Sequence, residues 1–195
     1  MNKTYVALLL DETGSMESYK KDTIGGFNNF LIEQKASGNN IKFSLTLFNS
    51  SKIEKRYVNE DISKAKELCE ENYKPSNLTP LWDAIGTTIN EMEEEKDVLF
   101  VILTDGHENA SKEFRSDTVK DMIKKKQEMG WQFLFLGADL SDFNDALNVG
   151  ININVNISKH EMQKAYSSLS QTISTYATKR KMGFILQTKG AKCAI

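Results

Sequence analysis

The stretch Leu8-Leu9-Leu10-Asp11-Glu12-Thr13-Gly14-Ser15-Met16 decides the fold, because a hydrophobic run stops there at a carboxylate and a glycine-containing turn. Residues 5–10 are hydrophobic without interruption, which predicts a strand buried on both faces, as in a parallel sheet. Asp11 then stands at the carboxyl end of this strand, and Gly14 allows the backbone to turn tightly after it. The stretch therefore predicts a buried parallel strand that delivers polar side chains to one edge of a sheet.

The polar side chains of this stretch are Asp11, Thr13 and Ser15, which can point into one concavity. One carboxylate and two hydroxyls are hard oxygen donors, and such a set suits Mg²⁺, which keeps several waters and takes few protein carboxylates. The alternative is an ordinary strand-to-helix turn in which Thr13 or Ser15 caps the next helix. The stretch alone leaves both interpretations open, and the rest of the chain has to decide between them.

Length and composition limit the class of protein. The chain has 195 residues, and we expect a single domain over residues 1–195 with a proper core. Its composition, 39% hydrophobic and 27% charged, is that of an ordinary soluble globular protein. The formal net charge of −2 argues against a nucleic-acid partner, for which a strongly basic surface is expected.

Cysteine usage and the N-terminal residues bear on the compartment. Cys69 and Cys193 lie far apart and show no metal-binding spacing, which predicts free thiols in a reducing environment. The sequence starts with a short polar segment and then a strand, so neither a signal peptide nor a membrane-spanning run is expected. The sequence therefore predicts a cytoplasmic protein without membrane contact.

Hydrophobic periodicity predicts alternating strands and helices along the chain. We expect strands at 5–10, 41–48, 53–58, 98–104, 131–136 and 151–157, and helices at 19–35, 61–71, 80–96, 116–129, 141–148 and 158–181. The turn between the second and third strands is too short for a crossover helix, so the third is expected as an antiparallel partner at the sheet edge. The pattern predicts a doubly wound α/β fold with a mostly parallel, six-stranded sheet and helices on both faces.

Some side-chain patterns within these helices carry their own expectations. Gly25-Gly26 predicts a close approach of the first helix to the sheet, and the run 124–126 of lysines predicts a solvated helix face. The last helix has a narrow hydrophobic stripe, for which docking on the sheet is favoured over a coiled-coil dimer. We therefore expect a monomer.

Three segments combine into one motif at the carboxyl ends of the strands: Asp11-x-Thr13-x-Ser15, Thr79 before a helix, and Asp105-Gly106 after the strand at 98–104. Alone, Thr79 would be an ordinary N-cap and Asp105-Gly106 a turn. Together, in this order, they favour a metal site in the crevice where chain order reverses.

In order and spacing these segments resemble the metal-ion-dependent adhesion site (MIDAS) of von Willebrand factor A-type (vWA) domains, whose motif is Asp-x-Ser-x-Ser, a distant Thr and a distant Asp-Gly. The resemblance extends from residue 5 to about residue 181 and implies a Rossmann-like α/β fold. Thr13 stands where the family has a serine. Its hydroxyl can still bind a metal, although the extra methyl group tightens the site.

The resemblance implies a role for each residue of the motif. Ser15, Thr13 and, in one of two states, Thr79 would contact the metal directly, and Asp11 and Asp105 would act through waters and hydrogen bonds. The implied cofactor is Mg²⁺, with Mn²⁺ or Ca²⁺ as alternatives. Since neutral hydroxyls leave the ion short of negative charge, an Asp or Glu of a partner protein would complete its coordination. The expected function is therefore metal-dependent protein binding inside the cell, without catalysis.

The remaining polar and aromatic residues near the motif receive simpler interpretations. Glu12 is expected to point away from the metal, toward a partner. His107 and Glu108 are expected as exposed loop residues, with partner contact, or base catalysis by His107, as the alternative. Trp82 and Trp131 are expected to be packing residues.

Two other functions stay open. An Mg²⁺-dependent phosphohydrolase would use Asp11 as its nucleophile, but Thr13 replaces the second carboxylate expected two residues later, and no Gly-Lys-Ser run is present. A structural or assembly protein would use the ion only to stabilise its fold.

Overall fold

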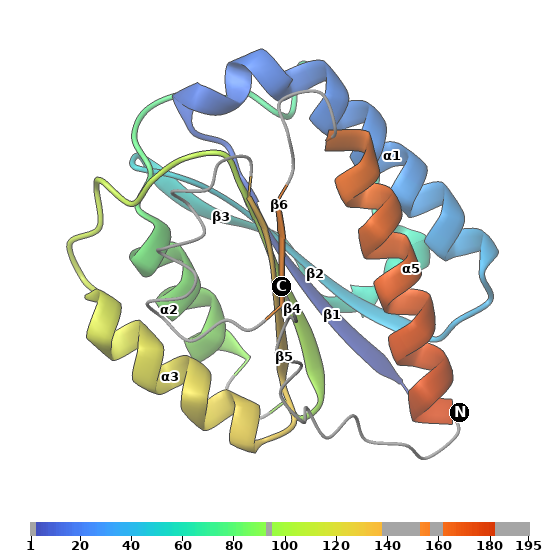
Figure 1. Ribbon diagram of the computed structural model, residues 1–195. Helices are drawn as coiled ribbons and strands as arrows, with labels where there is room; N and C mark the ends of the chain where they lie inside the picture. The colour runs from blue at the N-terminus through green and yellow to red at the C-terminus, as the bar shows by residue number, and fades with distance from the viewer. Residues whose placement is uncertain (1–2, 93–94, 138–152, 157–161, 182–195) are drawn as a thin grey trace, which may run out of the picture.

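The computed structural model describes residues 3–92, 95–137, 153–156 and 162–181, and it shows one central sheet with helices on both faces (Figure 1). Among these residues the sheet is six-stranded, in the order β3-β2-β1-β4-β5-β6. Its strands are β1 (Thr4–Asp11), β2 (Ile41–Asn49), β3 (Lys52–Asp61), β4 (Val98–Thr104), β5 (Gln132–Gly137) and β6 (Ile153–Asn156). The helices are α1 (Lys20–Ala36), α2 (Leu81–Glu91), α3 (Ser116–Glu128) and α5 (Met162–Lys181), with short 3-10 turns at η1 (Gly14–Tyr19) and η2 (Ile62–Lys64).

Strand pairing confirms the α/β class and the antiparallel edge pair. β1 lies between β2 and β4 and is parallel to both, and β5 and β6 continue the parallel order. β3 pairs with β2 in the antiparallel direction and lies at the edge. The chain order therefore reverses between β1 and β4, as the sequence predicts, and the carboxyl ends of these two strands share one edge of the sheet.

Two hydrophobic clusters, one on each face of the sheet, hold the layers together. On one face α1 and α5 lie side by side, and Phe27, Phe30 and Tyr166 pack beneath them against Leu8 and Leu10. On the other face α2 and α3 pack against the alternate side chains of β1 and β4. Burial on both faces explains why β1 is hydrophobic without alternation.

The stripe on α5 docks on this first cluster. Leu169, Ile173 and Tyr176 are buried against the sheet and α1, which confirms docking as the role of the stripe.

The predicted close approach of Gly25-Gly26 to the sheet is wrong, because the helix that approaches there is α5. A Cβ atom on Gly26 would lie 2.3 Å from the ring of Tyr166 on α5, whereas one on Gly25 would meet nothing within 4 Å. The glycine therefore admits a neighbouring helix, not the sheet.

The predicted helix at 61–71 is wrong. The structure has only the single turn η2, and several backbone groups of the following residues bond to side chains of α1 and β3. The Asn28 side chain accepts from the amide of Leu68 and donates to its carbonyl, at 2.8 and 2.9 Å. These tertiary bonds take over the backbone groups that a helix would have used, which local periodicity does not reveal.

The lysine run 124–126 is only partly a solvated face. Lys126 is 6% exposed, and its ammonium lies 4.9 Å from the ring centroid of Trp131, a cation–π contact. Trp131 and Trp82 are buried in the second cluster, which confirms both as packing residues.

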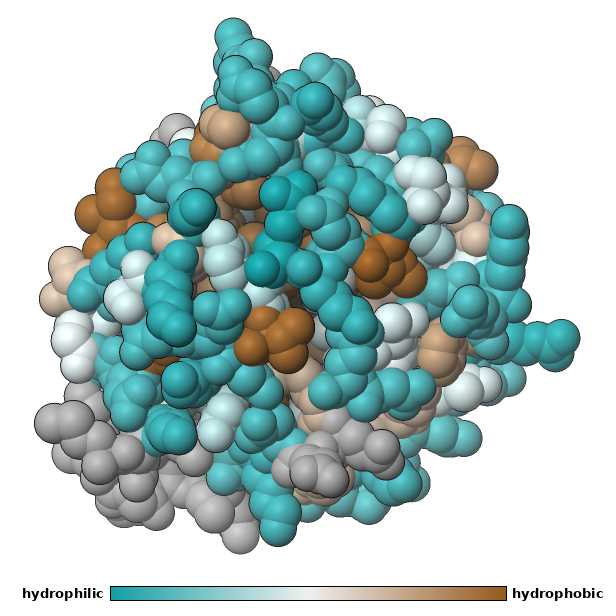
Figure 2. Space-filling model, turned by 180° about the vertical axis from the view of Figure 1, so that it is seen from behind, coloured by the Kyte–Doolittle hydropathy of each residue, from teal (hydrophilic) through white to brown (hydrophobic). Residues whose placement is uncertain are grey.

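Some expectations fall outside the described residues, namely the helix at 141–148 and Cys193. Cys69 is exposed and carries a free thiol. No helix in the described part of the chain combines the length and hydrophobicity needed to cross a membrane. Seen from behind, the surface is mostly hydrophilic, with hydrophobic side chains scattered singly among polar ones (Figure 2). Such scattered side chains are normal for a folded domain.

Candidate metal centre

The predicted site residues meet where β1 and β4 end. Ser15 donates a hydrogen bond from Oγ to Oδ1 of Asp105 at 2.7 Å, although 90 positions separate the two residues in sequence. The hydroxyl oxygens of Thr13 and Ser15 lie 3.1 Å apart. The turn after β1 and the turn after β4 therefore form one continuous polar cluster.

Asp11 lies beneath this cluster and is completely buried. Its Oδ1 accepts from the amide of Thr13 at 2.6 Å, and its Oδ2 accepts from the hydroxyl of Thr104 at 2.5 Å. Burial raises the pKa of Asp11 to about 7, although the hydrogen bonds from Thr104 and Thr13 act in the opposite direction. Both hydrogen-bond partners are neutral, so among the described residues the ionised carboxylate is paired with no positive side chain.

The backbone carbonyl of Asp11 is held by Tyr73, whose hydroxyl donates a hydrogen bond to it at 2.6 Å. Burial raises the pKa of Tyr73 well above its ordinary value, so this phenol is neutral and remains a donor. Tyr73 thus holds the end of β1 without adding charge to the cluster.

Thr79 reaches the same cluster from the loop before α2. A Cβ atom built on Gly106 would lie 2.9 Å from Oγ1 of Thr79 and 3.3 Å from Oγ of Ser15. Both hydroxyls therefore face the α-carbon of Gly106. A glycine at this position leaves room for the Thr79 hydroxyl, which a Cβ atom would displace.

The alternative role of Thr79 as an N-cap is wrong. α2 begins after Pro80, and no side chain of the cap residue bonds to its first turn. Instead the backbone of Thr79 exchanges two hydrogen bonds with Asn109, at 2.8 Å to the Asn109 side chain and 3.0 Å from its amide. The Thr79 side chain is thereby left to the cluster, beside Ser15.

The donor set suits a small, hard cation. Two carboxylates and three hydroxyls converge, from Asp11, Asp105, Thr13, Ser15 and Thr79. Within the described ranges no group of three or more His, Cys, Asp or Glu side chains could hold a metal ion. A metal at this edge would therefore depend on hydroxyl oxygens, which suit Mg²⁺ and not the soft metals that thiolates and imidazoles select. Ser15 is exposed, so the cluster is open to solvent.

Comparison with known proteins agrees with this fold. A family model described as von Willebrand factor type A domain matches residues 6–154. The chain belongs to the vWA domain family. Such domains commonly act as protein-interaction or adhesion modules, and this vWA domain places its five motif residues at the carboxyl edge of the sheet. No curated protein sequence matches it.

Solved structures share the fold at low sequence identity. The pilus adhesin SpaC of Lactobacillus rhamnosus GG, in its open conformation, superimposes with a TM-score of 0.64 at 14% identity, over 89% of this chain and 30% of SpaC. An aerotolerance-related membrane protein of Bacteroides fragilis gives 0.59 at 15% identity, over 88% of this chain and 99% of that one. Proximal thread matrix protein 1 of the mussel byssus gives 0.57 at 13% identity over 88% of this chain, which spans 46% of the mussel protein. At these identities the likeness establishes the fold alone.

Several residues that support the site of this vWA domain were not predicted. Thr104, Tyr73 and Asn109 orient Asp11 or Thr79, as described above. Only Thr104 had a signal in the sequence, since it directly precedes Asp105 at the end of a predicted strand. The bonds of Tyr73 and Asn109 join segments 62 and 30 positions apart, and no local pattern marks them.

Glu108 is not the free loop residue that the sequence predicts. Its carboxylate accepts from the amide of Trp82 at 2.9 Å in the first turn of α2, and from the amides of Ala110 and Ser111. Glu108 therefore caps α2 from a distant loop and favourably meets the positive end of the helix dipole. His107 beside it is exposed, as expected.

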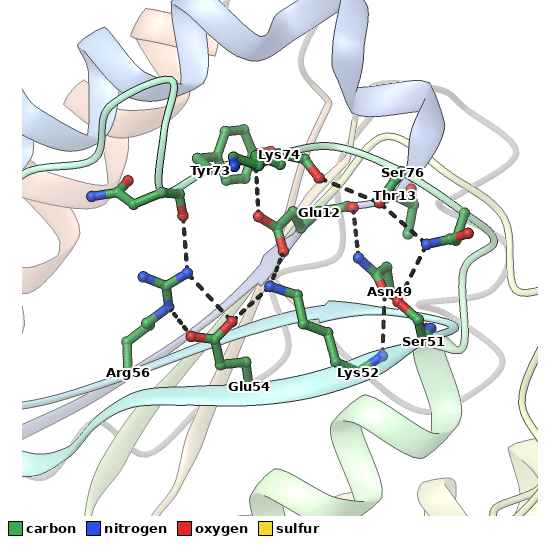
Figure 3. Close-up of polar contacts among 12 residues, drawn as sticks. Glu12, Thr13, Asn49, Ser51, Lys52, Glu54, Arg56, Tyr73, Lys74 and Ser76 are labelled. Atoms are coloured by element: carbon green, nitrogen blue, oxygen red, sulfur yellow. Dashed lines mark hydrogen bonds and ion pairs between the residues drawn. The ribbon is translucent and has the colours of Figure 1, made fainter.

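Glu12 also departs from expectation. It does not contact the hydroxyl cluster, but its side chain is 1% exposed and so is not offered to a partner. Its carboxylate forms an ion pair with Nζ of Lys52 at 2.9 Å and accepts from the amide of Lys74 at 2.7 Å (Figure 3). Burial lowers the pKa of Lys52, but its contacts with Glu54 and Glu12 outweigh this and raise the pKa overall. Lys52 is therefore a fixed positive charge.

Proposed function

We propose that this vWA domain binds a divalent cation, Mg²⁺ first among them, through a MIDAS formed by Asp11, Thr13, Ser15, Thr79 and Asp105. The ion then binds a carboxylate of a partner protein. The observation that carries the proposal is the hydrogen-bonded cluster Thr13–Ser15–Asp105 above a buried Asp11 whose charge meets only neutral donors. Such a cluster offers a cation oxygen ligands and leaves it with net positive charge for an anionic ligand in trans.

Direct titration tests the metal site. Isothermal calorimetry with MgCl₂, repeated with MnCl₂, should show one binding event in the wild-type domain and none in Ser15→Ala or Asp105→Ala. Ser63→Ala and Asp117→Ala are matched controls, because these residues lie on η2 and α3 and not in the cluster. Wild-type affinity in Ser15→Ala and Asp105→Ala would refute the proposal.

Partner binding through the ion has its own test. The domain is immobilised in Mg²⁺, exposed to the proteins of the cell from which it comes, and eluted with EDTA. The proposal expects a protein that EDTA releases, that Asp105→Ala does not retain, and that loses binding when one of its own Asp or Glu residues is replaced. Equal retention by wild type and Asp105→Ala contradicts metal-mediated binding.

The exposed free thiol of Cys69 supports a reducing compartment, so the cytoplasm is the proposed setting.

We propose binding, not turnover, as the role of this site. A phosphohydrolase would need Asp11 to attack a phosphate, yet Asp11 is completely buried and each of its carboxylate oxygens already accepts a hydrogen bond. A phosphatase assay with Mg²⁺ checks this. Turnover that Asp11→Asn abolishes would favour the enzyme instead.

A purely structural ion is the remaining alternative. It predicts that EDTA lowers the melting temperature while the captured partner stays bound. Release of the partner by EDTA from a domain that remains folded, followed by circular dichroism, separates the two.

A further inference from the structure

Glu12 lies inside the metal-binding motif but faces away from the metal side. Its carboxylate is buried and contacts two separate segments, Lys52 at the start of β3 and the amide of Lys74 in the loop before α2. Figure 3 shows the carboxylate between these two segments. A buried carboxylate without partners would be strongly unfavourable. The Glu12 side chain can therefore stay buried only while both contacts are kept.

The segment that Glu12 holds leads directly to Thr79. Two further hydrogen bonds join the same two loops, from the amide of Ser76 to the carbonyl of Glu12 at 3.0 Å and from the amide of Gly14 to the carbonyl of Asn77 at 2.9 Å. Residues 12–14 and residues 74–77 are thus bonded at three successive points. The first loop carries Thr13 and Ser15, and the second ends at Thr79, so these bonds fix the spacing between the hydroxyls of the proposed site.

Lys52 ties the loop of Glu12 to the β2–β3 hairpin. Its backbone amide donates to the Asn49 side chain at 3.2 Å, and its ammonium pairs with Glu54 at 2.6 Å as well as with Glu12. Glu54 also holds Arg56, which donates to the carbonyl of Asn72 at 2.9 Å. The charged side chains at the start of β3 therefore hold the loop before Thr79 at a second point.

We propose that the Glu12–Lys52 ion pair is a positioning element of the metal site, which sets the distance between the loop of Thr13 and Ser15 and the loop of Thr79. It touches no metal ligand atom and acts through the backbone on either side. The inference rests on the proposed metal-binding function. Groups that orient metal ligands without touching the ion typically change affinity about 10- to 100-fold when removed.

Metal titration of three variants tests the role. Glu12→Ala and Lys52→Met should each bind Mg²⁺ about 10- to 100-fold more weakly than wild type. Lys55→Met is the matched control, because it removes a lysine of the same strand that pairs with Glu91 on α2, away from both loops. It should leave the affinity unchanged.

A double variant covers the case in which the single replacements do not fold. Glu12→Gln combined with Lys52→Met removes both charges, and glutamine can still accept from the amide of Lys74. The domain should then fold and bind Mg²⁺ more weakly than wild type but more tightly than a folded Glu12→Ala. Wild-type affinity in this double variant would overturn the positioning role.

Amide hydrogen exchange in EDTA supplies a readout that does not depend on metal. In Glu12→Ala we expect faster exchange at Lys74 and Ser76 and unchanged exchange at Val101 in the centre of β4. Faster exchange at all three would indicate general destabilisation and would overturn the local role. If the wild-type domain takes up no Mg²⁺, the proposed function fails and the role in affinity fails with it. If the wild-type domain binds Mg²⁺ and the Glu12 and Lys52 variants bind it equally tightly, only the positioning role is wrong.

Discussion

The carboxyl end of β1 has two sides, and they differ in how a buried carboxylate is compensated. On one side Asp11 meets a hydroxyl and an amide, which are neutral donors. On the other side its neighbour Glu12 meets the ammonium of Lys52. Among the described residues the Asp11 carboxylate has no positive partner, whereas Glu12 joins its loop to β3 through Lys52. Two adjacent acidic residues in one motif thus have different environments, and the two proposed roles follow from that difference.

The largest expected effect is on the pH dependence of stability without metal. The pKa of Asp11 is raised from 3.8 to about 7 in the folded state, so between these values the folded state binds more protons than the unfolded state. Stability contributed by this group is therefore lost as pH rises from about 4 to about 7. Relative to Asp11→Asn, the free energy of unfolding of the wild type should fall by about 2–3 kcal/mol between pH 5 and pH 8.

Urea unfolding in EDTA at several pH values measures this difference. Glu12→Gln should show no comparable advantage at high pH, since Lys52 compensates that carboxylate. Parallel pH profiles for wild type and Asp11→Asn would mean that Asp11 is not the uncompensated group.

Metal binding beside Asp11 should offset the stability that is lost when this buried carboxylate ionises. At a free Mg²⁺ concentration about 100 times the dissociation constant, binding to the folded state raises the free energy of unfolding by about 2.7 kcal/mol. Asp105→Ala should gain nothing and Asp117→Ala should gain the full amount. Thermal and urea unfolding with and without Mg²⁺ measure the gain, and an equal gain in both variants would place the ion elsewhere.

Removal of the Glu12–Lys52 ion pair should lower the free energy of unfolding. Lys52→Met leaves the Glu12 carboxylate buried without its cation. Because Lys52 is 41% exposed, the cost is smaller than for a fully buried pair, and we expect about 2 kcal/mol. Adding Glu12→Gln should restore most of this loss. Urea unfolding of the single and double variants gives both values, and a double variant no more stable than Lys52→Met would show that the charge is not the cause.

The smallest expected effect changes the hydroxyl side by one methyl group. Gly106→Ala would bring its Cβ atom to 2.9 Å from Oγ1 of Thr79 and displace that hydroxyl. We expect about tenfold weaker Mg²⁺ binding, which is about 1.4 kcal/mol, with little change in unfolding of the ion-free domain. Calorimetry measures the affinity. Unchanged affinity would show that the position of the Thr79 hydroxyl beside Gly106 does not matter for ion binding.

The two sides also differ in how well the sequence predicts them. β1 and β4 are unbroken hydrophobic runs that end at Asp11 and Asp105, and neighbouring parallel strands bring such ends together. The convergence of the motif residues could therefore be predicted without coordinates. The metal and the partner carboxylate are proposals that rest on the chemistry of these donors.

The partner of Glu12 could not be predicted in the same way. Periodicity indicates whether a side chain is buried, but not which residue of a hairpin 40 positions away meets it. The same limit applies to Leu68, whose backbone bonds to Asn28, and to Gly26, which admits Tyr166. Each of these contacts joins distant segments and leaves no local pattern in the sequence.

The most direct test of the difference between the two sides is a crystal structure of the domain grown in MnCl₂, with an anomalous difference map at the manganese edge. We expect one strong peak about 2.1 Å from the hydroxyl oxygens of Thr13 and Ser15, next to Asp11 and Asp105. A peak next to Glu12, or a map without a peak at the carboxyl ends of β1 and β4, would contradict this expectation.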